Sequence, residues 1–164
     1  MGGIIYEERL FSRWMTLTLG VVTLLTLWQV VQQLQGGAPA DDRPAWLLPL
    51  MAVFLALVTA NFVFLTIRIT DEEVVVAYGV VRRRIRWEDI EDCYRDEASS
   101  IRYGGFGIRR GRYNGIKRLV YNTMGDPRVV LLTSDASTPE FVFSTAQPEE
   151  VLNRVREQMK SVKR

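Results

Sequence analysis

Two long runs of uncharged residues constrain this 164-residue chain more than any other feature. No Asp, Glu, Lys or Arg occurs from Trp14 to Ala40, or from Pro44 to Ile67. Each run exceeds the roughly 20 apolar residues with which a helix crosses a hydrocarbon core of about 30 Å. We therefore expect a transmembrane hairpin of two helices, at about 14–34 and 45–67.

The positions of Arg near the spans predict how the hairpin is oriented. Arg9 and Arg13 precede the first span and Arg68 follows the second, whereas the connecting loop contains only Arg43. Because Lys and Arg near spans stay on the cytoplasmic side, we expect a multi-pass protein of the cytoplasmic (inner) membrane with both termini cytoplasmic. A cleaved signal peptide is the alternative, since Ala38-Pro39-Ala40 is typical of a cleavage site, but the apolar run is longer than a signal sequence needs.

Small residues recur along one side of each predicted span. Such spacing lets two helices approach closely in lipid. It predicts packing of the two spans on each other or, alternatively, on another membrane subunit, and a polar side chain at mid-depth of the second span would suit either case. These packing candidates are Thr16, Gly20, Thr23, Ala52, Ala56, Ala60 and Asn61. No ionisable residue lies inside a span, which disfavours a transporter or channel.

After the second span the chain changes to a pattern of short strands. Apolar and β-branched segments are separated by Gly, Asn, Asp, Ser or Pro, as in a β-sandwich or barrel. A helix with an apolar stripe follows, with Pro148 at its first position and Glu149 and Glu150 in its first turn. We expect a cytoplasmic N-terminal segment (1–13), the hairpin (14–67) and a cytoplasmic β domain (68–164) whose C-terminal helix covers 148–162. The strands are expected at 74–78, 80–87, 90–94, 105–110, 117–121, 129–133 and 141–143.

Three parts of the chain carry a family resemblance: residues 69–76 followed by 85–90, 104–109 through 121–122, and 143–150. They resemble bacterial membrane-anchored proteins with PH-like domains. The resemblance spans about 64–160 and implies a mainly β PH-like barrel or sandwich that is non-catalytic and binds proteins or headgroups. The turn Asp71-Glu72-Glu73 is acidic, so phosphoinositide binding is not carried over. The layout is also similar, at the level of architecture, to a two-span photosystem assembly factor.

A basic segment rich in Gly and aromatic residues is the main binding candidate. It contains no acidic residue between positions 102 and 118. Arg with aromatic residues is typical of protein interfaces, and clustered cations also attract anionic headgroups. A solvated hairpin is the simplest interpretation, and nucleic acid fits a membrane-held domain poorly. The candidate residues are Arg102, Tyr103, Phe106, Arg109, Arg110, Arg112, Tyr113, Lys117 and Arg118.

The composition argues against most catalytic sites. The chain has no His and one Cys, so a Ser-His pair, a His-ligated metal and an internal disulfide are excluded. We expect no enzymatic activity, cofactor or metal. The acidic groups at 71–73, 89–92 and 96–97 are interpreted as solvated turns, Cys93 as a buried residue, and the arginines at 82–86 as locally paired.

These features predict a non-catalytic accessory or scaffold subunit that docks on an integral-membrane protein complex. The first alternative is a membrane-surface sensor that binds anionic lipid headgroups through the basic segment. The second is an assembly factor for a membrane complex such as a photosystem. Expected partners are a membrane protein complex and membrane lipids, without nucleic acid.

Overall fold

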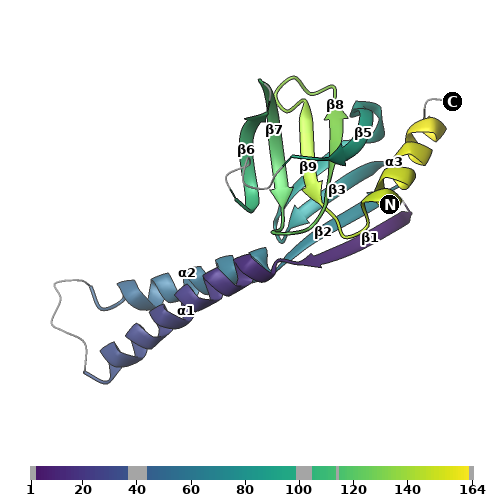
Figure 1. The fold of residues 1–164 in the computed structure, drawn as a ribbon. Coiled ribbons are helices and arrows are strands. Elements are labelled where there is room, and N and C mark those ends of the chain that lie inside the picture. Colours follow the sequence, from purple (N-terminus) through teal and green to yellow (C-terminus); the bar gives the residue numbers. More distant parts are fainter. Residues whose placement is uncertain (1–2, 37–43, 99–104, 114, 163–164) are drawn as a thin grey trace.

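A computed structural model describes residues 3–36, 44–98, 105–113 and 115–162, which form a helical hairpin joined to a β domain (Figure 1). Strand β1 (Ile4–Phe11) precedes helices α1 (Arg13–Leu34) and α2 (Leu47–Phe62). The elements that follow are β2 (Phe64–Thr70), β3 (Glu73–Tyr78), β4 (Val81–Arg86), the 3-10 helix η1 (Trp87–Asp89), β5 (Ile90–Asp96), β6 (Gly107–Tyr113), β7 (Ile116–Asn122), β8 (Arg128–Thr133), β9 (Glu140–Ser144) and α3 (Pro148–Val162).

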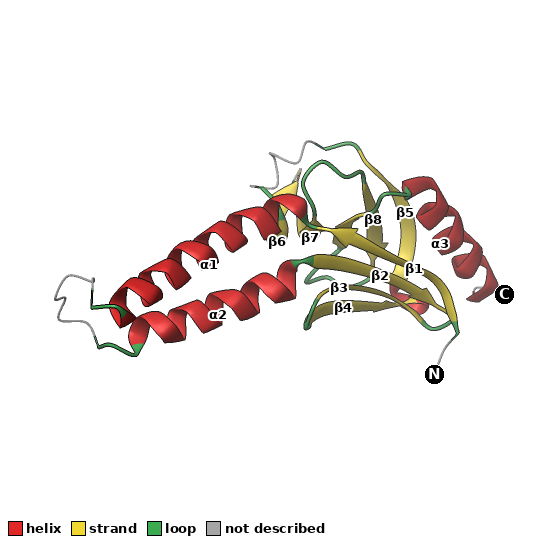
Figure 2. Cartoon of the chain, turned by 90° about the horizontal axis from the view of Figure 1, so that it is seen from below, coloured by secondary structure: helices red, strands yellow, loops and turns green. Residues whose placement is uncertain are grey.

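Helices α1 and α2 lie side by side and project away from the β domain (Figures 1 and 2). At 1.5 Å per residue, α1 extends about 33 Å and α2 about 24 Å. α1 is long and apolar enough to cross a membrane, whereas α2 is shorter. Leu24, Trp28, Phe54 and Leu57 are each more than 60% exposed. Soluble proteins rarely expose large apolar patches, and α1 could be a membrane span.

The second helix is shorter than the span expected at 45–67. Residues 64–67 belong to β2, in which Leu65, Ile67 and Ile69 are fully buried while Phe64 and Arg68 are exposed. Buried and exposed residues thus alternate with the period of a strand. The apolar composition of residues 64–67, which suggested a helix, is that of a buried strand. The predicted end of the second span is therefore wrong, whereas the first span at 14–34 agrees with α1.

The N-terminal segment belongs to the β domain, which contradicts the predicted separation of residues 1–13 from 68–164. β1 pairs antiparallel with β2, from Ile4 opposite Thr70 to Phe11 opposite Phe64. Only Leu10 of β1 is buried, so the sequence of this edge strand carries little alternation. The pairing brings the two ends of the hairpin together on one side. Removal of the chain up to residue 40 as a signal peptide would also remove this strand.

Two sheets and one helix enclose the core of the β domain. The first sheet has the order β1-β2-β3-β4 and is antiparallel. The second has the order β5-β8-β9-β7-β6 and is mixed, because β7 runs parallel to β9. The core cluster includes Ile67, Val76, Phe141, Phe143 and Val155. All seven strands expected from the sequence are present with shifted ends, and β1 and β2 complete the first sheet.

Helix α3 covers the residues predicted for it, 148–162. Val151, Leu152 and Val155 are buried in the core cluster, and Met159 packs against it. Because these positions share one helical face, the apolar stripe closes the β domain while the charged face stays in solvent.

Of the arginines of β4, Arg86 is paired with neighbouring acids as predicted, whereas Arg83 pairs with the distant Asp135. Arg84 lies 3.6 Å from Glu73, and Arg86 lies 2.7 Å from Glu88. These exposed pairs keep the edge strand charged, which discourages unwanted strand pairing.

Candidate functional site

The predicted basic residues lie on the hairpin formed by β6 and β7, which we call the basic hairpin (residues 107–122). Arg109, Arg110 and Arg112 are on β6, and Lys117 and Arg118 are on β7. Phe106 directly precedes β6, and Tyr113 is its last residue. Arg102 and Tyr103 lie outside the described residues.

The register of the basic hairpin divides its cations between two faces. Arg110 is opposite Leu119 and Arg112 is opposite Lys117, so these four side chains share one face. Arg109 is opposite Val120 and Gly111 is opposite Arg118 on the other face. The sequence predicted one cluster, and the strand period separates it into two.

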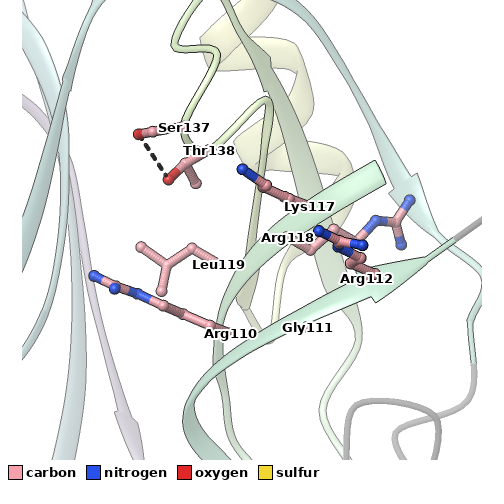
Figure 3. Close-up of a pocket in the computed structure, with 8 residues that line it drawn as sticks. All are labelled: Arg110, Gly111, Arg112, Lys117, Arg118, Leu119, Ser137 and Thr138. Atoms are coloured by element: carbon pink, nitrogen blue, oxygen red, sulfur yellow. Dashed lines mark hydrogen bonds between the residues drawn. The ribbon is translucent and has the colours of Figure 1, made fainter. Parts of the chain in front are cut away.

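Arg110, Arg112 and Lys117 line a pocket of about 400 Å³ (Figure 3). Leu119 contributes its apolar floor, and Ser137 and Thr138 come from the loop between β8 and β9. In Figure 3 the Lys117 ammonium points toward Thr138. The hydroxyl oxygens of Ser137 and Thr138 lie 3.5 Å apart. Cations beside hydroxyl groups suit an anionic group such as a carboxylate or phosphate.

The cations of this pocket are available to a ligand. Among the described residues, none of the acidic side chains lies within 4.0 Å of Arg110, Arg112 or Lys117. All three residues are exposed. An ion pair with an outside carboxylate would therefore replace water rather than an existing partner. We call this the basic pocket, defined by Arg110, Arg112, Lys117, Ser137 and Thr138.

An ordered turn holds the loop that carries the two hydroxyl groups. Asp135 accepts hydrogen bonds from the backbone N–H of Ser137 at 2.9 Å and from its hydroxyl at 2.7 Å. Arg83 of β4 reaches the same carboxylate at 2.8 Å. The Ser137 hydrogen bonds and Arg83 together lower the pKa of Asp135 to about 2. The first sheet thus fixes one wall of the basic pocket.

Arg118, which was predicted as a binding residue, is buried and makes ionic contacts within the β domain. Its side chain is only 4% exposed. It donates to the Glu140 carboxylate, lies 3.6 Å from Asp96, and stacks 4.2 Å from the ring centre of Tyr113. Buried cations need such partners because desolvation is otherwise unfavourable. Tyr113 therefore also serves the fold through this contact.

The acidic group at 96–97 is likewise more than a solvated turn. The Asp96 side chain is 3% exposed and accepts from Arg128 Nε at 2.8 Å. Tyr94 donates to Glu140 at 3.2 Å, and burial is the main cause that raises the Tyr94 pKa. These residues form an ionic network on the outer face of the second sheet.

Only part of the predicted small-residue packing lies between α1 and α2. Thr23 and Ala52 are buried, and the hydroxyl oxygens of Thr23 and Thr59 are 3.1 Å apart. Ala56 and Ala60 are exposed, because positions four apart rotate by about 40° around a helix. Thr16 is half-buried on the same side as Thr23. At Gly20 an added Cβ would meet no atom within 4 Å, so Gly20 does not pack closely against α2.

Asn61 was predicted to lie at mid-depth of the second span. In the structure it lies at the end of α2 instead. Its Oδ1 accepts from the Val80 N–H at 2.8 Å, and its Nδ2 donates to the Tyr78 carbonyl at 3.3 Å. Gly79 has a φ of +51°, and a Cβ there would stand 2.2 Å from Asn61 Oδ1. Asn61 therefore attaches the helix to the turn between β3 and β4.

No metal or thiol site stands out in the part of the chain that the structure describes. Within these ranges no group of three or more Cys, Asp or Glu side chains is placed to hold a metal ion. Cys93 is buried as expected, and burial raises the pKa of its thiol. A reactive thiolate at this position is therefore disfavoured.

Comparison with family models, curated proteins and solved structures found no match for this chain.

Proposed function

We propose that this protein is a non-catalytic accessory subunit of the cytoplasmic membrane, which docks on a larger membrane protein complex. In this proposal both helices lie in the membrane and a PH-like β domain faces the cytoplasm. The observation that carries it is the junction between hairpin and β domain, which contains no flexible linker. α1 follows β1 and α2 precedes β2, each after a single intervening residue, Ser12 or Val63.

Several contacts make this junction rigid. The Ser12 N–H donates to the Val63 carbonyl at 2.8 Å, which closes the base of the hairpin. The rings of Phe62 and Tyr78 lie 5.4 Å apart, and Phe62 packs against the core of the β domain. A domain held in this way presents its surface at a fixed position relative to the helices. That geometry suits a subunit that braces a neighbour.

The hairpin offers a surface for another membrane helix. Gly20, Ala56 and Ala60 are outside the contact between α1 and α2, and because Gly has no side chain and Ala only a methyl group, a second helix could approach closely there. Transmembrane helices associate through such small residues. This surface supports the second of the two predicted alternatives, in which the spans pack against another membrane subunit.

The basic pocket offers a second contact, on the β domain. β6 starts beside α1, because a Cβ on Gly107, whose φ is +93°, would meet Met15 Cε at 2.9 Å. From there β6 runs about 20 Å to its turn. Arg112 and Lys117 thus lie at the end of the basic hairpin away from α1 (Figure 1). Cations at that end favour an acidic segment of a partner protein over the headgroups around α1.

Native-size analysis of the full chain tests this function. After extraction from its own membrane in mild detergent, the protein should migrate in an assembly far above its 18.8 kDa. The double variant Arg110→Glu and Lys117→Glu should release it from that assembly. Lys160→Glu, an exposed change on α3, is the matched control and should leave the assembly intact. A monomer in wild-type membranes would contradict the proposal.

The headgroup sensor remains the second candidate, because the basic pocket combines three cations with two hydroxyl groups. Nanodiscs that contain the full chain separate the two functions. If the basic hairpin binds headgroups, its backbone amides should exchange more slowly in anionic than in zwitterionic lipid. Equal exchange in both lipids supports docking on a protein.

A further inference from the structure

We propose that an anionic phospholipid headgroup binds where α1 meets the β domain, between Arg13, Arg9 and the turn that connects β7 with β8. This inference rests on the proposed insertion of the hairpin in a membrane and adds a ligand site to it. The site is separate from the basic pocket and shares no residue with it.

A pocket of about 450 Å³ occupies this position. Its walls come from four parts of the chain: the end of β1, the first residues of α1, the turn between β7 and β8, and the connection from β9 to α3. The residues that the argument uses are Arg9, Arg13, Trp14, Thr123, Met124 and Asp126. We call it the junction pocket.

The charge of the junction pocket favours an anion. Arg13 is exposed, and none of the described carboxylates lies within 4.0 Å of it. Arg9 is 62% exposed and its Nε lies 3.4 Å from the Glu7 carboxylate. Asp126 is the pocket's carboxylate, and it accepts a hydrogen bond from the Thr123 hydroxyl at 2.6 Å. The junction pocket is thus lined by two arginines and one carboxylate, and that carboxylate is hydrogen-bonded to Thr123.

The apolar side chains around the junction pocket favour the phosphate of a lipid over a soluble anion. Trp14 is 54% exposed, Met124 52% and Phe11 49%. Trp is enriched where headgroups meet hydrocarbon, because its ring is apolar and its N–H is polar. A phosphate between the two arginines would place its acyl chains along this apolar rim and the exposed side of α1. A soluble phosphate would leave the rim uncovered.

The height of the junction pocket relative to the proposed membrane agrees with a lipid headgroup as its ligand. α1 begins at Arg13, and the uncharged sequence that follows is long enough to cross the hydrocarbon core. The first residue of the helix therefore stands at the headgroup level if α1 spans the membrane. The basic pocket, in contrast, lies along the half of β6 that is farther from α1.

Native mass spectrometry of the full chain, released from nanodiscs, tests the proposal. The nanodiscs contain equal amounts of phosphatidylglycerol and phosphatidylcholine. Wild type should retain one phosphatidylglycerol in preference to phosphatidylcholine. Arg13→Gln and Arg9→Gln should each lower this retention about fivefold, the effect of one cation near an anionic surface. Arg84→Gln, an exposed arginine on β4, should leave it unchanged.

Each other outcome has a defined meaning. Equal retention of the two lipids, or equal loss with Arg84→Gln, overturns the junction pocket as a specific site. Displacement of the lipid by millimolar inorganic phosphate would assign the site to a soluble anion and overturn the lipid. Alkaline carbonate extraction tests the membrane insertion separately. Release of the chain from membranes by carbonate would overturn the proposed function, whereas retention there with no lipid preference overturns only this inference.

Discussion

The carboxamide oxygen of Asn61 accepts a hydrogen bond from the backbone N–H of Val80 at 2.8 Å, which ties the end of α2 to the turn between β3 and β4. The residues are 19 positions apart in the chain. The contact joins the apolar hairpin to the β domain through a polar group at their boundary.

Asn61→Ala should lower the free energy of unfolding by about 1–2 kcal/mol, because it removes two hydrogen bonds worth about 1 kcal/mol each. Thermal unfolding of the full chain in detergent, followed by circular dichroism, measures this loss. Asn153→Ala, on the exposed face of α3, is the control and should change stability by less than about 0.5 kcal/mol. Equal effects of the two changes would show that the Asn61 contact contributes nothing.

Arg118→Met should destabilise the β domain by about 3–5 kcal/mol, since Glu140 and Asp96 would lose a buried cation. Arg112→Met, on the exposed side of the same hairpin, should change stability by less than about 0.5 kcal/mol. Denaturant titration with near-UV circular dichroism compares the two. Similar stabilities would contradict a structural role of Arg118.

Glu8→Ala should loosen the connection between β9 and α3. The Glu8 carboxylate accepts from the Thr145 hydroxyl at 2.6 Å, the Ala146 N–H at 2.7 Å and the Tyr6 hydroxyl at 3.0 Å. Hydrogen bonds to a charged group contribute about 1.5–3 kcal/mol. Hydrogen exchange should therefore accelerate at the Ala146 amide, while Glu7→Ala leaves this amide unchanged. Unaltered exchange in Glu8→Ala would refute the contact.

The Asp135 carboxyl should titrate near pH 2, below its ordinary value of 3.8. Because the folded pKa is lower than the unfolded one, the carboxylate contributes stability above about pH 4 and loses that contribution as the pH falls toward 2. NMR titration of its side-chain carbon measures the midpoint. Arg83→Gln should move the midpoint up toward 3.8, and an unchanged midpoint would exclude Arg83 as a partner.

Elements with local signals could be predicted from the sequence. Pro148, Glu149 and Glu150 with the apolar stripe define α3, because helix capping and periodicity act within a few residues. The β-branched, apolar run from Val74 to Tyr78 similarly predicts β3. The uncharged run defines α1, since length and composition alone decide whether a helix suits a membrane.

Contacts between distant segments could not be predicted in this way. Arg118 meets Glu140 because β7 and β9 are parallel neighbours in register, 22 residues apart. Without knowledge of that register, the sequence does not distinguish the buried Arg118 from the exposed Arg110 or Arg112. β1 was missed because an edge strand needs few buried residues. Phe64 to Ile67 looked helical because a buried strand and a membrane helix are equally apolar over four residues.

The absence of a linker between the hairpin and the β domain gives the molecule a mechanical property. Strand β2 extends about 23 Å from the end of α2. If the hairpin tilts by about 10°, well within the range of membrane helices, the far end of that strand moves by about 4 Å. In the proposed membrane arrangement, a change in bilayer thickness, or in the tilt of a neighbouring helix, would therefore displace the β domain together with any bound partner.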